Sequence, residues 1–214
     1  MEQENIFKWK HYQPDIILLT VRWYLRYNLS FRDLVEMMEE RGVSLAHTTI
    51  MRWVHQYGPE LNERIRTHLK LTNNSWRVDE TYIKIKGEKM YLYRPIDSEG
   101  NTIDFYLSRK RDAKAADGDK AYPVAIRELK EEKCIPHGIP LRVKKDLNNI
   151  IEQDHRFIKK RIWNMLGLKS LRTATKMIAG IEAMHMIKKG QTLQGEKSIQ
   201  KQMYLINEIF GLTA

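Results

Sequence analysis

The stretch at residues 76–87, WRVDETYIKIKG, constrains the fold of this chain more than any other. It is rich in β-branched and aromatic residues, and Gly87-Glu88 offers a turn at its end, so it predicts a strand. Its apolar residues fall on both alternating faces, which is typical of a central strand covered on both sides. Asp79 lies in the middle, although aspartate is disfavoured in strands and costly to bury unpaired. An acid at a sheet edge or in a salt bridge is one explanation, and a functional carboxylate is the other.

The charge balance points to a polyanionic partner. The chain has 37 Lys+Arg against 27 Asp+Glu, a formal net charge of +10, and a pI near 9.6. Nucleic acid is the first partner to consider for such an excess, although a protein can also be basic without a polyanionic partner.

Cysteine usage and hydropathy exclude several classes. Cys134 is the only cysteine, so there is neither an internal disulfide nor a cysteine metal cluster. No apolar run approaches the roughly 20 residues of a membrane span, and the N-terminal stretch lacks the apolar core of a signal peptide. We therefore expect a cytoplasmic protein without a membrane partner.

The first 60 residues predict three helices. Pro14 opens the first helix. The second helix begins with a near capping box formed by Ser30 and Asp33, and Gly42 ends it. The third helix runs from about residue 46 to 57. Two short helices joined by a tight turn are typical of a helix-turn-helix. The residues expected to face the major groove are His47, Thr48, Thr49, Arg52, His55 and Gln56. A three-helix bundle with a solvated polar face is the alternative.

A fourth helix is expected over residues 61–69, before the polar stretch at 72–75, which reads as a linker. The expected domains are therefore 1–71, a helix-turn-helix DNA-binding domain, and 72–214, a second domain.

The second domain continues with two more strands, residues 90–96 and 102–107, so three consecutive antiparallel strands are expected. No strand is expected over 108–116. A helix over 147–163 carries Glu152, and a last strong helix begins at Ser170 with a methionine-rich core face; a further helix lies after residue 191. An ordinary surface Glu152 paired with Arg156 or His155 is an alternative to a functional one.

Three acids stand out together: Asp79, either Asp117 or Asp119, and Glu152. Two-metal phosphoryl transfer needs about three carboxylates that converge on two Mg²⁺ ions. The chain has no Walker loop, GxSxG, HExxH or Cys–His zinc spacing that would compete with this interpretation.

Several long strings resemble transposases of insertion sequence family six. They are WRVDETYIKIKG, YLYRPIDSEGNTIDFYLSRKRDAKAA, DKAYPVAI, LNNIIEQDHRFIKKR and FGL, with SFRDLVEMMEERGVSLAHTTIMRWV in the first domain. The resemblance implies an α+β protein with an RNase H-like DDE core, in which Asp79, Asp117 and Glu152 are catalytic and hold two Mg²⁺ (or Mn²⁺) ions. Between Asp117 and Glu152 lie 34 residues, the family's usual interval, which favours Asp117 over Asp119.

The chain departs from the family in two places. The family has a helix and a strand between SRKRDAKAA and the second aspartate, whereas here the two strings abut and about twenty residues are missing. The core is therefore expected to lack one helix and one strand, and with them the rigid support of the second acid. Asp146 stands where the family usually has a tyrosine.

The resemblance implies a transposase that binds the terminal repeats of its element, cleaves DNA and transfers the freed strand. His155, Arg156 and Lys159 would then contact the DNA backbone, and the chain would act as a homodimer or higher oligomer on double-stranded DNA. The alternative is an internally deleted remnant that binds DNA without catalysis. A transcription regulator would need an effector domain, and residues 76–214 resemble a nuclease core instead.

Overall fold

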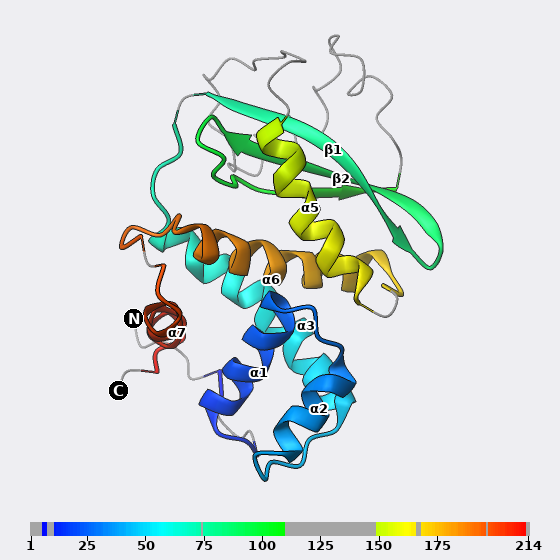
Figure 1. The fold of residues 1–214 in the computed structure, drawn as a ribbon, viewed down its shortest axis with the longest axis vertical. Coiled ribbons are helices and arrows are strands. Elements are labelled where there is room, and N and C mark those ends of the chain that lie inside the picture. Colours follow the sequence, from blue (N-terminus) through cyan, green and yellow to red (C-terminus); the bar gives the residue numbers. More distant parts are fainter. Residues whose placement is uncertain are drawn as a thin grey trace. The chain divides into compact units, whose positions relative to one another are not determined.

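The computed structural model describes residues 6–7, 11–73, 75–109, 149–165, 168–195 and 197–212 of the chain (Figure 1). These residues combine helices with a small antiparallel sheet, which confirms the expected α+β class. They form two compact units. Unit 1 comprises Met1–Lys70, Trp163–Leu166 and Thr175–Ala214, and unit 2 comprises Leu71–Ile162 and Gly167–Ala174. The break after residue 70 falls next to the expected linker, whereas most of the C-terminal part, expected in the second domain, packs with the N-terminal helices.

The N-terminal part of unit 1 consists of α1 (Pro14–Arg26), α2 (Phe31–Glu39) and α3 (His47–Ile65). The expected near capping box is confirmed: the Ser30 N–H donates to Asp33 Oδ2 at 2.7 Å, and the Asp33 N–H donates to Ser30 Oγ at 3.1 Å. Gly42 follows α2 with a φ of +74°, a left-handed conformation that glycine adopts readily. These local signals set the ends of α2.

The third helix corrects the expected boundaries. We expected separate helices over 46–57 and 61–69, but α3 continues through Pro59 to Ile65 and is followed by a short 3₁₀ turn, η1 (Arg66–His68). A proline inside a helix removes one backbone hydrogen bond and costs about 3 kcal/mol. The continuous helix buries Tyr57, Leu61 and Ile65 on one side, and this burial offsets the cost of the proline.

Unit 1 is completed by most of α6 (Leu171–Lys189) and by α7 (Ile199–Ile209). As expected, Ser170 caps α6, because its Oγ accepts the Thr173 N–H at 3.1 Å. The methionines of α6 are buried, which confirms that they fill the core. The tail helix starts only at Ile199 and buries Leu205, Ile206 and Ile209.

Unit 2 is built on a β-hairpin of β1 (Trp76–Ile85) and β2 (Glu88–Asp97), to which the short β3 (Tyr106–Ser108) adds. The described sheet has the order β1-β2-β3 and is antiparallel, as expected. The third strand is shorter than expected, because residues 102–105 contribute only an isolated bridge, between Thr102 and Ile96. Lys86 (φ +53°) and Gly87 (φ +84°) form the turn, one residue earlier than expected.

The two faces of the hairpin differ. One face carries Thr81, Ile83 and Ile85 of β1 with Met90 and Leu92 of β2, all buried. The other face exposes Tyr82 by 52% and also exposes Lys84 and Lys89. The expectation that β1 is covered on both sides is therefore wrong near the turn, because the side chain of Tyr82 faces solvent there.

The helix α5 (Asn149–Trp163) lies across the hairpin of unit 2 (Figure 1). It ends at Trp163, as expected for the helix over 147–163, and residues 147 and 148 lie outside the described part of the chain. Among the described helices, none is long and apolar enough to cross a membrane.

Candidate active site and DNA-binding helix

Asp79 lies in the middle of β1, on the face of the sheet that α5 covers. Its Oδ1 accepts the Glu80 N–H at 2.9 Å, and its Oδ2 lies 3.3 Å from His155 Nε2 on α5. This contact is close enough for a charge interaction but lacks the alignment of a hydrogen bond, since neither ring nitrogen of His155 has a hydrogen-bond partner among the described residues. The side chain of Asp79 is 30% exposed, so the carboxylate is accessible from solvent while its position is fixed from two sides.

A buried ion pair beside this contact fixes the position of α5. Arg94 of β2 lies directly opposite Asp79 in the register, and its Nη2 is 2.7 Å from Asp154 Oδ2. The two side chains are 0% and 9% exposed. Two consecutive residues of α5, Asp154 and His155, thus contact two opposite residues of the hairpin, which aligns the helix with the strand that carries Asp79.

Glu152 occupies the backbone position three residues before His155 on α5. Residues three apart lie on neighbouring positions of one helix face, so this backbone position is adjacent to the Asp79 contact. The side chain of Glu152 lies outside the described part of the structure. Asp117, Asp119, Cys134 and Asp146 also lie outside the described residues.

The three cationic residues expected on α5 have different surroundings. His155, expected among the DNA contacts, is buried against Asp79 with 4% of its surface exposed. Arg156 and Lys159 are exposed, and Lys159 Nζ lies 5.5 Å from the centre of the Tyr82 ring. Arg156 and Lys159 are therefore accessible to a ligand, whereas His155 is in a position to orient Asp79.

The chemistry of Asp79 fits a magnesium site. Mg²⁺ prefers hard carboxylate oxygens, and each oxygen of Asp79 keeps a lone pair beyond the neighbour it already has. No group of three or more His, Cys, Asp and Glu suited to a metal occurs within the described residues. Of the three expected ligands, only Asp79 has a described side chain.

The residues expected to contact DNA in the first domain share one side of α3. Those residues are His47, Thr48, Thr49, Arg52, His55 and Gln56, and all of them are exposed or half-buried. The opposite side of α3 is buried through Ile50, Trp53 and Val54. The helix thus presents a polar, hydrogen-bonding face that contains no acid along residues 47–56.

His55 has a perturbed pKa. Partial burial lowers the pKa of this imidazole below its ordinary value, and the charge of Lys176 lowers it further. His55 and Lys176 line a pocket of about 410 Å³ together with Arg52, Gln56, Pro59, Glu60 and Glu63. The imidazole is therefore neutral at pH 7 and can donate and accept hydrogen bonds there.

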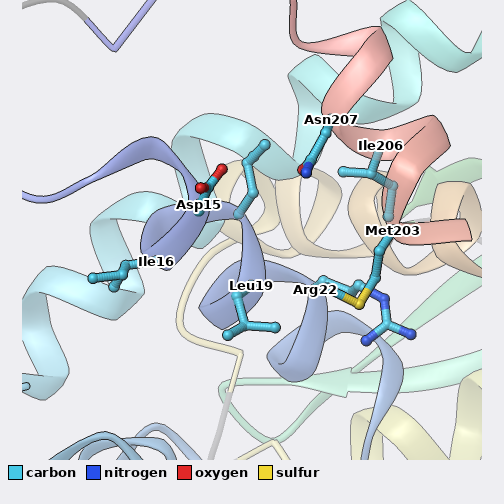
Figure 2. A pocket seen from close by; sticks show the side chains of 8 residues that line it. Asp15, Ile16, Leu19, Arg22, Met203, Ile206 and Asn207 are labelled. Atoms are coloured by element: carbon cyan, nitrogen blue, oxygen red, sulfur yellow. The ribbon is translucent and has the colours of Figure 1, made fainter. Parts of the chain in front are cut away.

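A second pocket, of about 290 Å³, lies between α1 and α7 of unit 1 (Figure 2). Its lining is mainly apolar, with Arg22 beside Met203, as Figure 2 shows. It contains none of the expected catalytic residues, so it does not belong to the candidate active site.

Two parts of the site were missed from the sequence: the ion pair between Arg94 and Asp154, and the contact of His155 with Asp79. Arg94 interrupts the otherwise apolar YLYRPI run of β2, and a buried charge in such a run needs a partner. That signal could have indicated the pair.

Comparisons with known proteins show the family of this chain. A family model described as a DDE domain matches residues 73–118 and 113–191. The chain is 38% identical over 208 aligned positions to the Staphylococcus aureus transposase for insertion sequence-like element IS431mec, covering 86% of this chain and 89% of the relative. The transposase for insertion sequence element IS257 in transposon Tn4003, also from Staphylococcus aureus, matches with the same identity and coverage. No solved structure gave a significant match.

The comparisons also agree with a missing internal segment. The two family matches overlap at residues 113–118, a range that includes Asp117. In the alignment with the IS431mec relative, 86% of 214 residues is about 184 residues, so about 24 of the 208 positions contain no residue of this chain. This number is close to the expected loss of about twenty residues.

Proposed function

Since this chain belongs to the DDE transposases of insertion sequence family six, we propose that it binds the terminal repeats of its element and catalyses DNA cleavage and strand transfer. The catalytic residues are Asp79, Asp117 and Glu152. The catalytic domain adopts an RNase H-like fold, and the first domain acts as a helix-turn-helix.

The observation that carries this proposal is the contact between α5 and β1. His155 lies 3.3 Å from Asp79, and the neighbouring Asp154 pairs with Arg94 at 2.7 Å. These two contacts hold the helix that carries Glu152 against the strand that carries Asp79. They support a common site for the two acids, although the acids are 73 positions apart in the sequence.

Asp79, Asp117 and Glu152 would hold two Mg²⁺ or Mn²⁺ ions. When bound, the ions activate the attacking oxygen and stabilise the leaving oxygen of the phosphodiester. Asp79 contributes carboxylate oxygens in a fixed orientation, because the Glu80 N–H and His155 restrain it from both sides. His155 serves as a positioning residue for Asp79, while Arg156 and Lys159 contact the DNA backbone.

DNA binding by the first domain is supported by the polar face of α3. His47, Thr48 and Arg52 are exposed, and no acid occurs on that face between residues 47 and 56. Side chains of this kind bind phosphates and base edges. The net charge of +10 adds attraction to duplex DNA. The chain acts on paired DNA ends as a homodimer or higher oligomer.

The second candidate function is a DNA-binding remnant without catalysis. The interrupted family match next to Asp117 favours it, because the missing segment would support the second acid. In this case the polar face of α3 would still occupy the terminal repeats.

An assay of cleavage and strand joining distinguishes the two functions. It uses labelled DNA that carries the element's own ends. The full chain and Asp79→Asn are compared with Mg²⁺ and with Mn²⁺. Cleavage that is lost in Asp79→Asn supports the transposase. Binding of the ends without cleavage by either protein supports the remnant, and absence of both binding and cleavage contradicts both functions.

A further inference from the structure

The end of the β1–β2 hairpin combines an exposed aromatic ring with several lysines. Tyr82 is 52% exposed, and its ring centre lies 5.1 Å from Lys89 Nζ and 5.5 Å from Lys159 Nζ. Lys84 lies directly opposite Lys89 in the register, and both are exposed. Lys86 occupies the turn. We call Tyr82, Lys84, Lys86 and Lys89 the hairpin end.

Two features of the hairpin end lower the stability of the fold. Lys84 and Lys89 are like charges directly opposite each other on adjacent strands, which destabilises a sheet. Lys86 has a φ of +53° in a two-residue turn whose left-handed positions favour asparagine or glycine. Locally unfavourable residues that persist in a fold point to a function other than stability.

The charges of the hairpin end match a polyanion. Three lysines converge on one face of the hairpin and its turn, and Lys159 of α5 adds a fourth cation to the same ring. Glu88 also lies at the turn, but it pairs with Ile85 in the register and so belongs to the other face. Clustered exposed lysines are the type of surface by which proteins bind the phosphate backbone of nucleic acid.

The hairpin end extends the strand that carries the candidate catalytic carboxylate, with Tyr82, Lys84 and Lys89 on the face of the sheet opposite to Asp79. Tyr82 follows Asp79 by three residues and Lys86 follows it by seven, so strand geometry places them about 10 and 23 Å along β1 from Asp79. Phosphates of one DNA strand are spaced by about 3.4 Å along the helix axis, so these distances correspond to about three to seven base pairs.

We propose that the hairpin end binds the phosphate backbone of duplex DNA a few base pairs from the phosphodiester that is cut. Lys84, Lys86 and Lys89 contact phosphates, and the ring of Tyr82 holds Lys89 and Lys159 in position. This inference rests on the proposed function and extends it to a DNA contact on the strand that carries Asp79.

The main test measures DNA binding as a function of salt. The full chain is titrated onto a fluorescein-labelled duplex that carries the element's terminal repeat, and anisotropy is followed at several NaCl concentrations. The triple variant Lys84→Gln, Lys86→Gln, Lys89→Gln is compared with a control of equal charge, Lys169→Gln, Lys197→Gln, Lys201→Gln, at exposed lysines elsewhere.

Each lost phosphate contact lowers the slope of log affinity against log salt by about 0.9, so the hairpin variant should lose about 2–3 in slope and at least about tenfold in affinity at low salt. The control should retain most of the affinity of the parent chain. Equal losses in both variants would mean that only net charge matters and would overturn the inference. Undiminished binding by the hairpin variant would overturn it as well. If the parent chain does not bind DNA, the proposed function fails together with the inference.

Two single substitutions separate DNA binding from folding. Lys86→Asn places a residue that suits the left-handed turn, so the thermal midpoint should rise while DNA affinity falls several-fold. Tyr82→Ala should weaken DNA binding several-fold. Tyr82→Phe keeps the aromatic ring and should bind DNA as tightly as the parent chain. If Lys86→Asn instead lowers the thermal midpoint, its weaker DNA binding would follow from loss of folded protein. That outcome would contradict a direct role of Lys86 in DNA binding.

Discussion

Tyr57 is a fully buried residue of α3 whose hydroxyl has no hydrogen-bond partner among the described residues. Its ring stacks on Phe7 with centroids 5.1 Å apart and meets Phe210 edge-on at 6.2 Å. Burial also raises the pKa of this phenol, so the hydroxyl stays neutral. A buried, unsatisfied hydroxyl costs about 1–3 kcal/mol, while the ring contacts are stabilising.

Tyr57→Phe should therefore stabilise the chain, by about 1 kcal/mol, because it removes the hydroxyl and keeps the ring. Urea denaturation of the two proteins measures the difference. Tyr57→Leu, which loses the ring contacts, serves as the control and should be destabilising. A lower stability of Tyr57→Phe than of the parent would show that the hydroxyl has a partner that matters.

His55 makes folding depend on pH. Burial and then Lys176 lower its pKa in the folded chain below the unfolded value of about 6.5. The neutral form is thus favoured by folding, so this contribution to stability is complete above pH 6.5 and is lost as the pH falls through the folded pKa. Thermal midpoints measured between neutral and mildly acidic pH should fall less for His55→Gln than for the parent chain. Parallel pH profiles for both proteins would contradict this assignment.

At the scale of elements, the ion pair between Arg94 and Asp154 holds α5 on the hairpin. The side chains are 0% and 9% exposed, so removal of the Asp154 carboxylate takes a close counter-charge away from the buried Arg94 guanidinium. Asp154→Ala should cost about 3–5 kcal/mol of stability and should abolish cleavage, because the helix that carries Glu152 loses its alignment. Urea denaturation and the cleavage assay measure the two effects.

The exposed pair Glu40–Arg41 provides the matched control. Its atoms are 3.9 Å apart and its side chains are 70% and 51% exposed, so Glu40→Ala should change stability by less than about 0.5 kcal/mol. The double variant Arg94→Met, Asp154→Leu removes both charges and should recover much of the lost stability. Equal effects of Asp154→Ala and Glu40→Ala would mean that the buried pair does not hold the helix.

The elements that could be predicted from the sequence are those set by local signals. The capping box at Ser30, the break at Gly42 and the strand around Asp79 depend on residues within a few positions of one another, and each occurs where expected. The continuation of α3 past Pro59 could not be predicted, because it depends on burial against distant residues. A Cβ on Gly180 of α6 would lie 2.9 Å from the Cα of Gly58, and no local pattern indicates that these two glycines meet.

For the candidate site, the sequence indicates the residue types but not their contacts. The acids Asp79 and Glu152 were identified from the sequence, largely through a family resemblance. The contact of His155 with Asp79 could not be predicted, because the spacing of His155 from Glu152 and Lys159 along α5 indicates the polar face of the helix, whereas packing on the hairpin buries the side chain. The position of a side chain on a helix thus predicts its neighbours only when it is known which strand or helix packs against that side of the helix.

At the scale of the whole molecule, the missing segment before Asp117 is expected to limit catalysis. The family resemblance implies that this segment supplies a strand that supports the second acid, and a misplacement of about 1 Å can cost about a hundredfold in rate. Inserting the corresponding segment of the IS431mec transposase before Asp117 should therefore raise metal-dependent cleavage by at least about tenfold.

The insertion is measured on labelled DNA with the element's ends, and a glycine–serine insertion of equal length serves as the control. A flexible insertion lengthens the connection without forming a strand, so it should not raise the rate. Asp79→Asn in the lengthened chain should be inactive, because the new activity uses the same carboxylate. If the parent and the lengthened chain cleave equally fast, Asp117 reaches the site without the segment and the loss of support is harmless. If the glycine–serine chain gains as much as the natural segment, the length of the connection limits the rate rather than its structure.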